Sequence, residues 1–313
     1  MGDHRDRVLS FIVRRLVLTV PVLFGVATLV FSLIHLVPGD PAAAMLGESA
    51  SPADLGDLRA KLGLDRPFLA QYGDFLAGLV VGDLGTSFRY GTPVGREIGQ
   101  RIGATSELAI VAMVVAMAIA LPLGIVGALY RGRAVDQAAM TISLAGIAMP
   151  NFWLGPLLAI VFSVQLGWLP VSGTGTWRHL VLPSLTLGAA LAAMTARMTR
   201  ASLIDELGEL YVLAARARGV SRLGAVLRHA LRNSLIPVVT IVGLQLGSVL
   251  TGTIITETIF SWPGVGRLLI QAISFRDYPL VQGCILLIAV TYVAMNLVVD
   301  LLYAWLDPRI RYQ

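Results

Sequence analysis

Six apolar runs, five of them close to the length that crosses a lipid bilayer as a helix, constrain this chain more than any other feature. A helix needs about 20 predominantly apolar residues to span the hydrocarbon core. The composition agrees, because 56% of the 313 residues are hydrophobic and 14% are charged, against roughly 25% charged in soluble domains. The alternation typical of membrane β-strands is absent from the sequence, so we expect helices. The predicted spans are residues 16–37, 107–130, 138–169, 180–198, 235–256 and 280–302.

The basic residues orient these runs. Of the 24 arginine and lysine residues, 15 lie in segments that are cytoplasmic if both termini are inside, and 3 lie in short outer loops. The other 6 lie in a long outer loop, and long loops cross the membrane largely regardless of their charge. This bias predicts a polytopic, all-α membrane protein with both termini in the cytoplasm. It also argues against nucleic acid as a partner, because the net charge of +5 is concentrated beside the ends of the runs.

Three regions follow from this layout. Residues 1–37 form the cytoplasmic N-terminus and the first span, and residues 38–105 form a small extracytoplasmic subdomain. Residues 106–313 form a core of five membrane helices. The core includes a cytoplasmic segment, residues 201–234, between the fourth and fifth spans.

The outer subdomain carries signals for two helices. Ser51 is placed to cap the first helix, with Pro52 in its first turn, and Gly63 is placed to end it. Residues 68–81 form a second, amphipathic stretch. The subdomain is too small to have a large hydrophobic core of its own.

The third run is too long for one straight crossing. Its length as a helix is about 48 Å, whereas the hydrocarbon core is about 30 Å thick. Part of the run must therefore lie outside the membrane, or the helix must tilt or bend. Pro150 and Pro156 permit a bend near Asn151.

Residues 205–237 are the longest polar interruption in the second half of the chain. One helix face there is apolar, with residues at helical spacing: Leu207, Leu210, Ala214 and Ala217. Gly219 is predicted to stop this helix, and Ser221 to cap the next one. We interpret the segment as a short cytoplasmic helix with a face for a partner; a helix resting on lipid headgroups is the alternative.

The sequence predicts no catalytic, cofactor-binding or metal site. A phosphate-loop ATPase needs the pattern G-x-x-x-x-G-K-[ST], and the one lysine, Lys61, lies in no such pattern. A proton-coupled carrier usually has acids inside its spans, whereas Asp136, Glu257 and Asp300 lie at span ends. No pairing of a nucleophile with a histidine base is evident within the spans.

Neutral polar and small residues within the runs are the remaining candidates for function. Polar side chains at this depth line a solute path or join helices: Asn151, Gln165, Gln245, Gln282 and Asn296. Gly243 and Gly247 have the G-x-x-x-G spacing that allows close helix packing. The predicted candidates for the pathway or an outer gate are Asn151, Gln245, Glu257, Phe260, Pro263 and Gly264.

Several motifs resemble those of one transporter family. Residues 211–219 (YVLAARARG) and 228–237 (RHALRNSLIP) resemble the cytoplasmic signature of binding-protein-dependent ABC importer permeases. These two stretches and several further segments, in the outer loops and at the C-terminal end, are together similar to the first permease subunit of the dipeptide/oligopeptide/nickel class. The further segments are residues 62–67 (LGLDRP), 82–87 (GDLGTS), 257–266 (ETIFSWPGVG), 276–279 (RDYP) and 307–311 (DPRIR).

The signature departs from the general pattern at one position. Leu213 stands where such permeases have a glutamate, whereas Ala214, Ala215 and Gly219 fit. The distance from Gly219 to Pro237 is also longer than in the general pattern. Both departures resemble the peptide-class variant, and they put in question any contact made by the missing acid.

The resemblance implies a multi-pass subunit of a bacterial cytoplasmic membrane that works by alternating access. Its implied partners are a second homologous permease, two ABC ATPase subunits, an extracytoplasmic solute-binding protein, a peptide substrate and membrane lipid. ATP hydrolysis would occur on the ATPase subunits. The implied ATPase-coupling residues are Glu209, Tyr211, Ala214, Ala215, Arg216, Ala217, Arg218 and Gly219.

Three alternatives stay open at this point. A nickel complex is the alternative substrate for a permease of this class. A proton-coupled secondary peptide carrier would transport alone, and a structural membrane scaffold would assemble partners without transport.

Overall fold

The computed structural model describes residues 2–36, 40–46 and 51–306. Their regular structure is helical, and the one pairing of extended backbone among them is an isolated bridge between Thr86 and Pro93. Two stretches have π-helical geometry, η1 and η2. The elements are α1 (Gly2–Leu36), α2 (Pro41–Leu46), α3 (Pro52–Lys61), α4 (Phe68–Val81), α5 (Val94–Leu129), α6 (Ala134–Ala148), α7 (Asn151–Ala159), η1 (Ile160–Gln165), α8 (Arg178–Leu207), α9 (Leu210–Ala217), α10 (Arg222–Ala225), η2 (Val226–Ala230), α11 (Leu231–Ile259), α12 (Val265–Ser274) and α13 (Tyr278–Leu306).

The described residues contain four helices long and apolar enough to cross a membrane. A bent helix pair, Ala134–Ala148 with Asn151–Gln165, forms a fifth candidate if the pair is one span. The first predicted span ends at Val37, which lies outside the described residues, and within α1 an apolar stretch of Val17–Ser32 is seen. The four spans are Val94–Leu129, Arg178–Leu207, Arg222–Gly247 and Tyr278–Val299.

The chain divides into two compact units. The first comprises Met1–Thr105 and Pro263–Val293, and the second comprises Ser106–Trp262 and Ala294–Gln313. Two long helices, α5 and α13, contribute to both units. The predicted outer subdomain, residues 38–105, falls in the first unit, together with α12.

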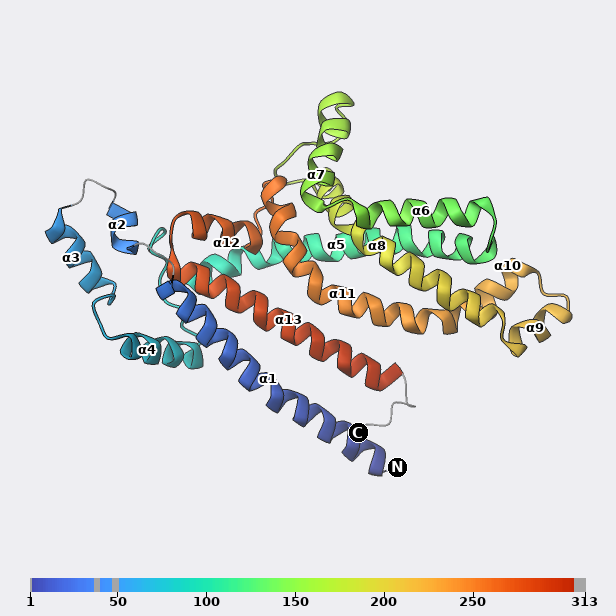
Figure 1. Ribbon diagram of the computed structural model, residues 1–313, viewed down its shortest axis with the longest axis horizontal. Coiled ribbons are helices and arrows are strands. Elements are labelled where there is room, and N and C mark those ends of the chain that lie inside the picture. The colour runs from blue at the N-terminus through green and yellow to red at the C-terminus, as the bar shows by residue number, and fades with distance from the viewer. Residues whose placement is uncertain (1, 37–39, 47–50, 307–313) are drawn as a thin grey trace. The chain divides into compact units, whose positions relative to one another are not determined.

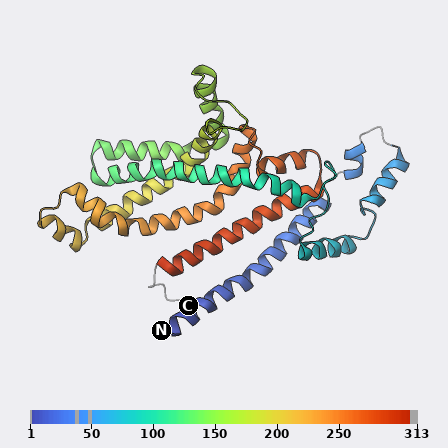
Figure 2. The ribbon, with the colours of Figure 1, turned by 180° about the vertical axis from the view of Figure 1, so that it is seen from behind.

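Helix α8 is the centre of the second unit, where α5, α6 and α11 lie beside it (Figures 1 and 2). Its buried face consists largely of alanine, glycine, serine and threonine, which let helix backbones approach closely. A Cβ atom added at Gly146 of α6 would lie 2.6 Å from the carbonyl oxygen of Ala189. A Cβ at Gly188 would lie 2.8 Å from the carbonyl oxygen of Ala112 in α5. Helix α8 is therefore in near backbone contact with neighbours on two sides.

The third apolar run bends at Pro150, as the prolines permit. The axes of α6 and the α7–η1 segment differ by 104°. Met149 has an extended backbone, with φ −93° and ψ 111°, which is the conformation favoured for a residue that precedes proline. Pro156 lies within α7 and does not end it. The bend divides the run, so its full length need not cross the membrane in one direction.

The start of the outer subdomain follows its predicted local signals. The Ser51 hydroxyl accepts a hydrogen bond from the Asp54 amide at the start of α3. Gly63 has φ +68° after the end of that helix. Helix α4 then packs on α1, where the ring of Phe31 lies 5.2 Å from that of Tyr72.

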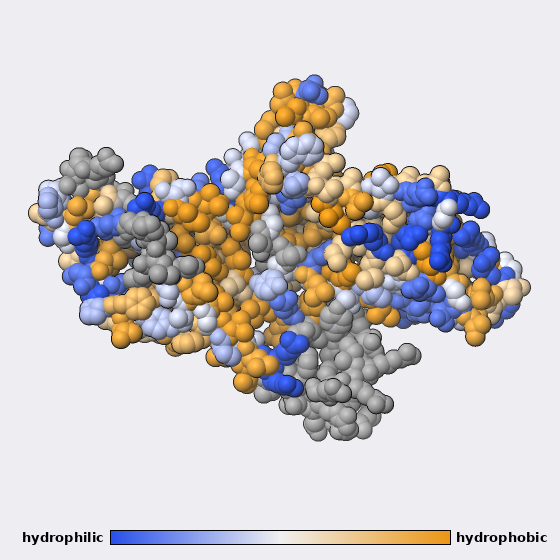
Figure 3. All heavy atoms as spheres, in the orientation of Figure 1, coloured by the Kyte–Doolittle hydropathy of each residue, from blue (hydrophilic) through white to orange (hydrophobic). Residues whose placement is uncertain are grey.

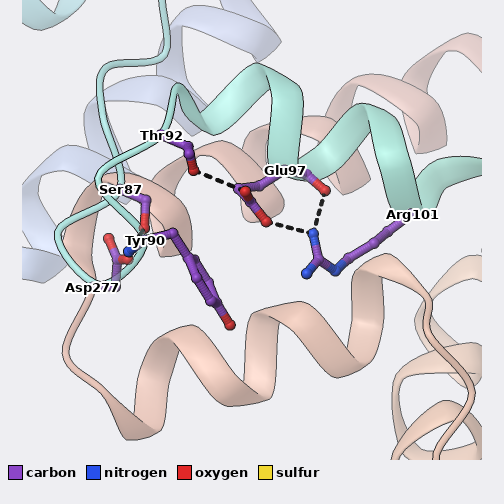
Figure 4. A network of polar contacts seen from close by, with 6 residues as sticks. All are labelled: Ser87, Tyr90, Thr92, Glu97, Arg101 and Asp277. Atoms are coloured by element: carbon purple, nitrogen blue, oxygen red, sulfur yellow. Dashed lines mark hydrogen bonds and ion pairs between the residues drawn. The ribbon is translucent and has the colours of Figure 1, made fainter.

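A buried carboxylate fastens two distant segments of the first unit. Asp277, just before α13, accepts hydrogen bonds from the Ser87 hydroxyl at 2.5 Å and from the amides of Phe88 and Arg89 at 3.1 Å. It also accepts from the amide of Leu280 at 3.3 Å. The first three donors connect the loop before α5 to the start of α13. Figure 4 shows this contact beside the links of Thr92 and Arg101 to Glu97.

We predict that Gly146→Ala destabilises the protein, because its new Cβ would collide with the backbone of α8. Overpacking of this kind typically costs about 1–3 kcal/mol, so the thermal-unfolding midpoint in detergent should fall. Gly99→Ala in α5 is the matched control, because nothing lies within 4 Å of its added Cβ. That control should be neutral or slightly stabilising, since alanine favours helix over glycine. Equal midpoints for both variants would contradict close packing at Gly146.

Candidate functional site

The predicted coupling segment lies at the C-terminal end of α8. Helix α8 ends at Leu207, and after Gly208 the chain starts α9 with Glu209 at its N-cap position. The carbonyl of Glu209 accepts hydrogen bonds from the amides of Val212 and Leu213, both at 3.1 Å. Figure 1 shows α9 and α10 together beyond this end of α8, and Figure 3 shows hydrophilic residues gathered over the same end. The segment is thus held by the central helix of its unit.

Gly219 ends α9, as the sequence predicts. Its φ is +93°, a left-handed conformation that glycine adopts without the penalty of a Cβ atom. The Gly219 amide donates to the Arg216 carbonyl at 2.9 Å, and the Val220 amide donates to the Ala215 carbonyl at 3.3 Å. This pair of bonds is a Schellman motif, which satisfies carbonyls left open at a helix end. The second predicted signal is also confirmed, because the Ser221 hydroxyl accepts from the Gly224 amide and caps α10.

Helix α9 has a buried apolar face. Val212 and Ala215 are buried, and Val212 belongs to a cluster with residues of α5, α8, α10 and η2. Val220, just after the helix, packs on the same cluster. This face fixes α9 to the rest of the second unit.

A second apolar face of α9 is exposed. Leu210 is 81% exposed and Leu213 is 44% exposed, and Ala214 and Ala217 are exposed beside them. The predicted stripe is wrong in one member: Leu207 belongs to α8 and packs inward on the buried cluster. The reason is the break at Gly208, which separates Leu207 from the helical spacing of α9. The exposed stripe therefore consists of Leu210, Leu213, Ala214 and Ala217.

Tyr211 ties α9 to the helices on both sides of it. Its hydroxyl donates to the carboxylate of Glu206 in α8 at 2.5 Å and accepts from the Asn233 amide group of α11 at 3.0 Å. Partial burial and the hydrogen bond to Glu206 raise the pKa of Tyr211, so the hydroxyl keeps its proton at neutral pH. The sequence resemblance selects Tyr211 but does not indicate this bridge.

The remaining predicted coupling residues are the charged residues Arg216, Arg218 and Glu209. Arg216 and Arg218 are exposed, and neither guanidinium forms an ion pair within the described part of the chain. Glu209 is exposed, and its side chain does not cap α9. The outward surface of α9 thus combines an apolar stripe with two arginines.

A partly buried ion pair links α8 to α6 near the coupling segment. Arg200 donates to Asp136 through Nε at 2.6 Å and through Nη2 at 2.7 Å. Asp136 also accepts from the amide of Gly132 at 2.8 Å. A bidentate arginine–carboxylate pair holds a defined geometry. Sequence reasoning placed Asp136 at a span end but gave no sign of this partner, which is 64 residues away.

Two of the predicted pathway residues lie in contacts between helices. The Gln245 carbonyl accepts from the Thr195 hydroxyl at 3.1 Å, and its amide group donates to the Leu191 carbonyl at 3.2 Å. Phe260 is buried with Ala159 and Leu182. Both residues hold α11, or the turn after it, against α8.

The other predicted gate and packing residues are distributed over both units. In the second unit, Asn151 is half-buried at the start of α7 and Glu257 is fully buried near the end of α11. In the first unit, Pro263 is exposed and Gly264 precedes α12 as its N-cap residue.

The predicted packing glycines are both buried in α11. A Cβ at Gly243 would lie 2.9 Å from a methyl group of Val299 in α13. Gly247, one turn further along α11, is also buried. Gly243 therefore lies where α11 and α13 pack closely.

These features are those of a membrane subunit of a binding-protein-dependent transport system, and the chain belongs to that family. Residues 120–312 match the family model described as the binding-protein-dependent transport system inner membrane component. Residues 8–109 match the N-terminal model of the corresponding membrane component. The chain is thus an ABC importer permease subunit of the peptide/nickel class, a translocation component rather than an enzyme. This membership decides against the carrier and scaffold alternatives.

The individual relatives cover almost the whole chain. The glutathione transport system permease protein GsiC of Escherichia coli (strain K12) is 47% identical over 305 residues, which are 97% of this chain and all of that protein. GsiC of Shigella flexneri serotype 5b (strain 8401) is similar to the same extent.

Solved structures support the fold. An inward-facing structure of the MetNI methionine ABC transporter matches with a TM-score of 0.56 and 17% identity, over 67% of this chain and 96% of that chain. An amino acid ABC transporter with histidines matches with a TM-score of 0.51 and 16% identity, over 69% of this chain and 94% of that chain. The family implies an ATPase and a solute-binding protein as partners, and the inner membrane of a bacterium as the location.

We predict that Tyr211→Phe loosens α9 without unfolding the chain. The variant removes hydrogen bonds to Glu206 and Asn233, each worth about 0.5–1.5 kcal/mol. The two bonds together are worth about 1–3 kcal/mol, so amide hydrogen exchange in α9 should become at least about fivefold faster. Tyr130→Phe is the control, because the Tyr130 hydroxyl makes no hydrogen bond among the described residues. Unchanged exchange in α9 would show that the bridge does not hold the helix.

Proposed function

We propose that this chain forms half of the pore of an ATP-driven importer for glutathione or other short peptides. One observation carries the substrate class: the 47% identity to a glutathione permease extends over the whole length of that protein. The general resemblance to the class leaves di- and oligopeptides as related substrates. A nickel complex is the less favoured substrate.

The proposed membrane layout has six spans with both termini in the cytoplasm. The five candidate spans support it, and α1 supplies the sixth. The charge bias of the loops gives the orientation. In this layout α9 faces the cytoplasm, and residues 38–105 face the outside.

The proposed coupling element is α9 with its C-terminal turn, Glu209 to Gly219. Its exposed stripe, which includes Leu210 and Leu213, would contact one of the two ATPase subunits. Its buried face and the Tyr211 bridge would transfer the movement of that subunit to α8 and α11. Leu213 would contribute apolar contact where related permeases have an acid.

The proposed complex contains this chain, a second homologous permease, two ATPase subunits and an outer solute-binding protein. The two permeases would alternate between outward and inward access as the ATPases close and open. Substrate selection would rest largely on the solute-binding protein. Asn151, Gln245, Glu257, Phe260, Pro263 and Gly264 remain proposed pathway or gate residues.

A strain that lacks this chain, and has no other glutathione importer, should lose ATP-dependent uptake of labelled glutathione. Complementation with the intact gene should restore uptake, because the other subunits cannot form the pore alone. Parallel assays with a labelled dipeptide and with nickel ions define the substrate class. Normal uptake of glutathione and of the dipeptide in the deletion strain would contradict the proposal. Selective loss of nickel uptake would show that the substrate is a nickel complex.

Gly219→Val should weaken retention of the ATPase subunits during purification of the complex. A β-branched residue at φ +93° strains the turn, and a left-handed conformation costs about 1–2 kcal/mol for such residues. No atom lies within 4 Å of an added Cβ, so backbone strain alone acts. Gly219→Asn is the matched control, because asparagine tolerates left-handed backbone better. If the Gly219→Val, Gly219→Asn and unchanged proteins retain the ATPase subunits equally, Gly219 has no role in coupling.

A further inference from the structure

Helix α4 in the first unit has an exposed apolar face that the transport mechanism does not use. Val80 is 88% exposed and Leu69 is 77% exposed. Residues 69, 73, 76, 77 and 80 fall on one side of the helix at spacings of three and four. This side carries Leu69, Gly73, Leu76, Ala77 and Val80 and has no charged residue.

A second side of α4 packs against α1. The ring of Phe31 in α1 lies 5.2 Å from Phe68 and 5.3 Å from Phe75, both on α4. The hydroxyls of Thr28 and Tyr72 are hydrogen-bonded at 2.6 Å. These contacts fix α4 to one short stretch of α1.

That stretch of α1 lies near the outer edge of the bilayer in the proposed layout. Phe31 is 16 residues beyond Arg15, which marks the cytoplasmic end of the apolar part. The rise of an α-helix makes this separation about 24 Å, and the hydrocarbon core is about 30 Å thick. The α1–α4 contact is therefore close to the outer membrane surface. Helix α1 itself also exposes apolar side chains, including Phe24 and Leu29.

The polar side of α4 points away from its exposed apolar side. Asp74 forms an ion pair with Arg66 in the preceding loop. The Gln71 amide group donates to the Arg66 carbonyl at 2.8 Å and to the Leu64 carbonyl at 3.4 Å. Helix α4 thus has loop residues 64–66 on one side and uncovered apolar residues roughly opposite.

We propose that α4 lies along the outer surface of the membrane, with Leu69, Leu76 and Val80 inserted among the lipids. Amphipathic helices in this position bury their apolar face at the boundary of headgroups and acyl chains. The occupant of the face is lipid, because α4 packs directly on α1, which exposes apolar side chains of its own and which the layout places in the bilayer. This inference rests on the proposed crossing of α1. It assigns the outer subdomain a membrane anchor.

The test places single fluorescent labels on the intact complex in lipid nanodiscs, on a Cys284→Ala background. Labels at Leu69→Cys and Val80→Cys should be quenched by lipids that carry a nitroxide near the headgroup. A label at Asp74→Cys is the matched control on the polar side of the same helix, and its exposed ion pair contributes little to stability. That label should instead be quenched by iodide in the water.

Two other outcomes would overturn the proposal. Quenching of the Leu69 and Val80 labels by iodide, to the extent seen at Asp74, would place this face in water. Protection of both labels from iodide and from nitroxide lipid would show that a protein covers the face. A label at Phe24→Cys, tested with a nitroxide deep in the acyl chain, reports on α1 alone. If the deep nitroxide quenches the Phe24 label but no nitroxide lipid quenches the labels on α4, α4 is not a membrane anchor, whereas the proposed crossing of α1 is unaffected.

Discussion

Close contact between helix backbones around α8 is the constraint on which the second unit depends. Glycines in α6 and in α8 itself place neighbouring backbones where a Cβ atom would lie within 3 Å of a carbonyl oxygen. In a membrane, helices gain little from hydrophobic burial against one another, so packing of this closeness contributes much of the association. It also limits how far α8 can bend or slide independently of α5 and α6. A displacement at the end of α8 is therefore shared by the helices around it.

The proposed coupling segment would depend on this rigidity. Helix α9 has eight residues, which is too short to be stable alone in water. Its buried face and the Tyr211 bridge supply the missing stability from α8, α10 and α11. The opposite face is left open, and its leucines are more apolar than the acid expected from the general signature. A contact made by such a face depends on shape and apolar area, and salt would screen it less than a contact made by a carboxylate.

Local signals in the sequence were sufficient for several parts of this arrangement. Gly219, Ser221 and Pro150 act through the backbone conformation of their own neighbourhood, so their roles can be predicted without the fold. The family resemblance selected the segment that contains α9. The apolar stripe was misassigned at Leu207 because helical spacing alone does not show the break at Gly208.

The contacts that position the site could not be predicted in the same way. Asp136 meets Arg200 from 64 residues away, and Asp277 meets Ser87 from 190 residues away. Glycine is required at position 146 only because the backbone of α8 at Ala189 packs against it. Each depends on which helices are neighbours, and a single sequence does not contain that information directly.

The two buried aspartates also bear on how the transporter obtains its energy. A proton relay needs a carboxylate with an oxygen free to exchange a proton with the pathway. Both oxygens of Asp136 accept hydrogen bonds from Arg200 or Gly132. Both oxygens of Asp277 accept from Ser87 or from backbone amides. An ionised carboxylate can only accept hydrogen bonds, and here its capacity is used to join separate segments. These acids therefore hold separate segments of the fold together, which agrees with the proposal that the energy for transport arrives through α9 from another subunit.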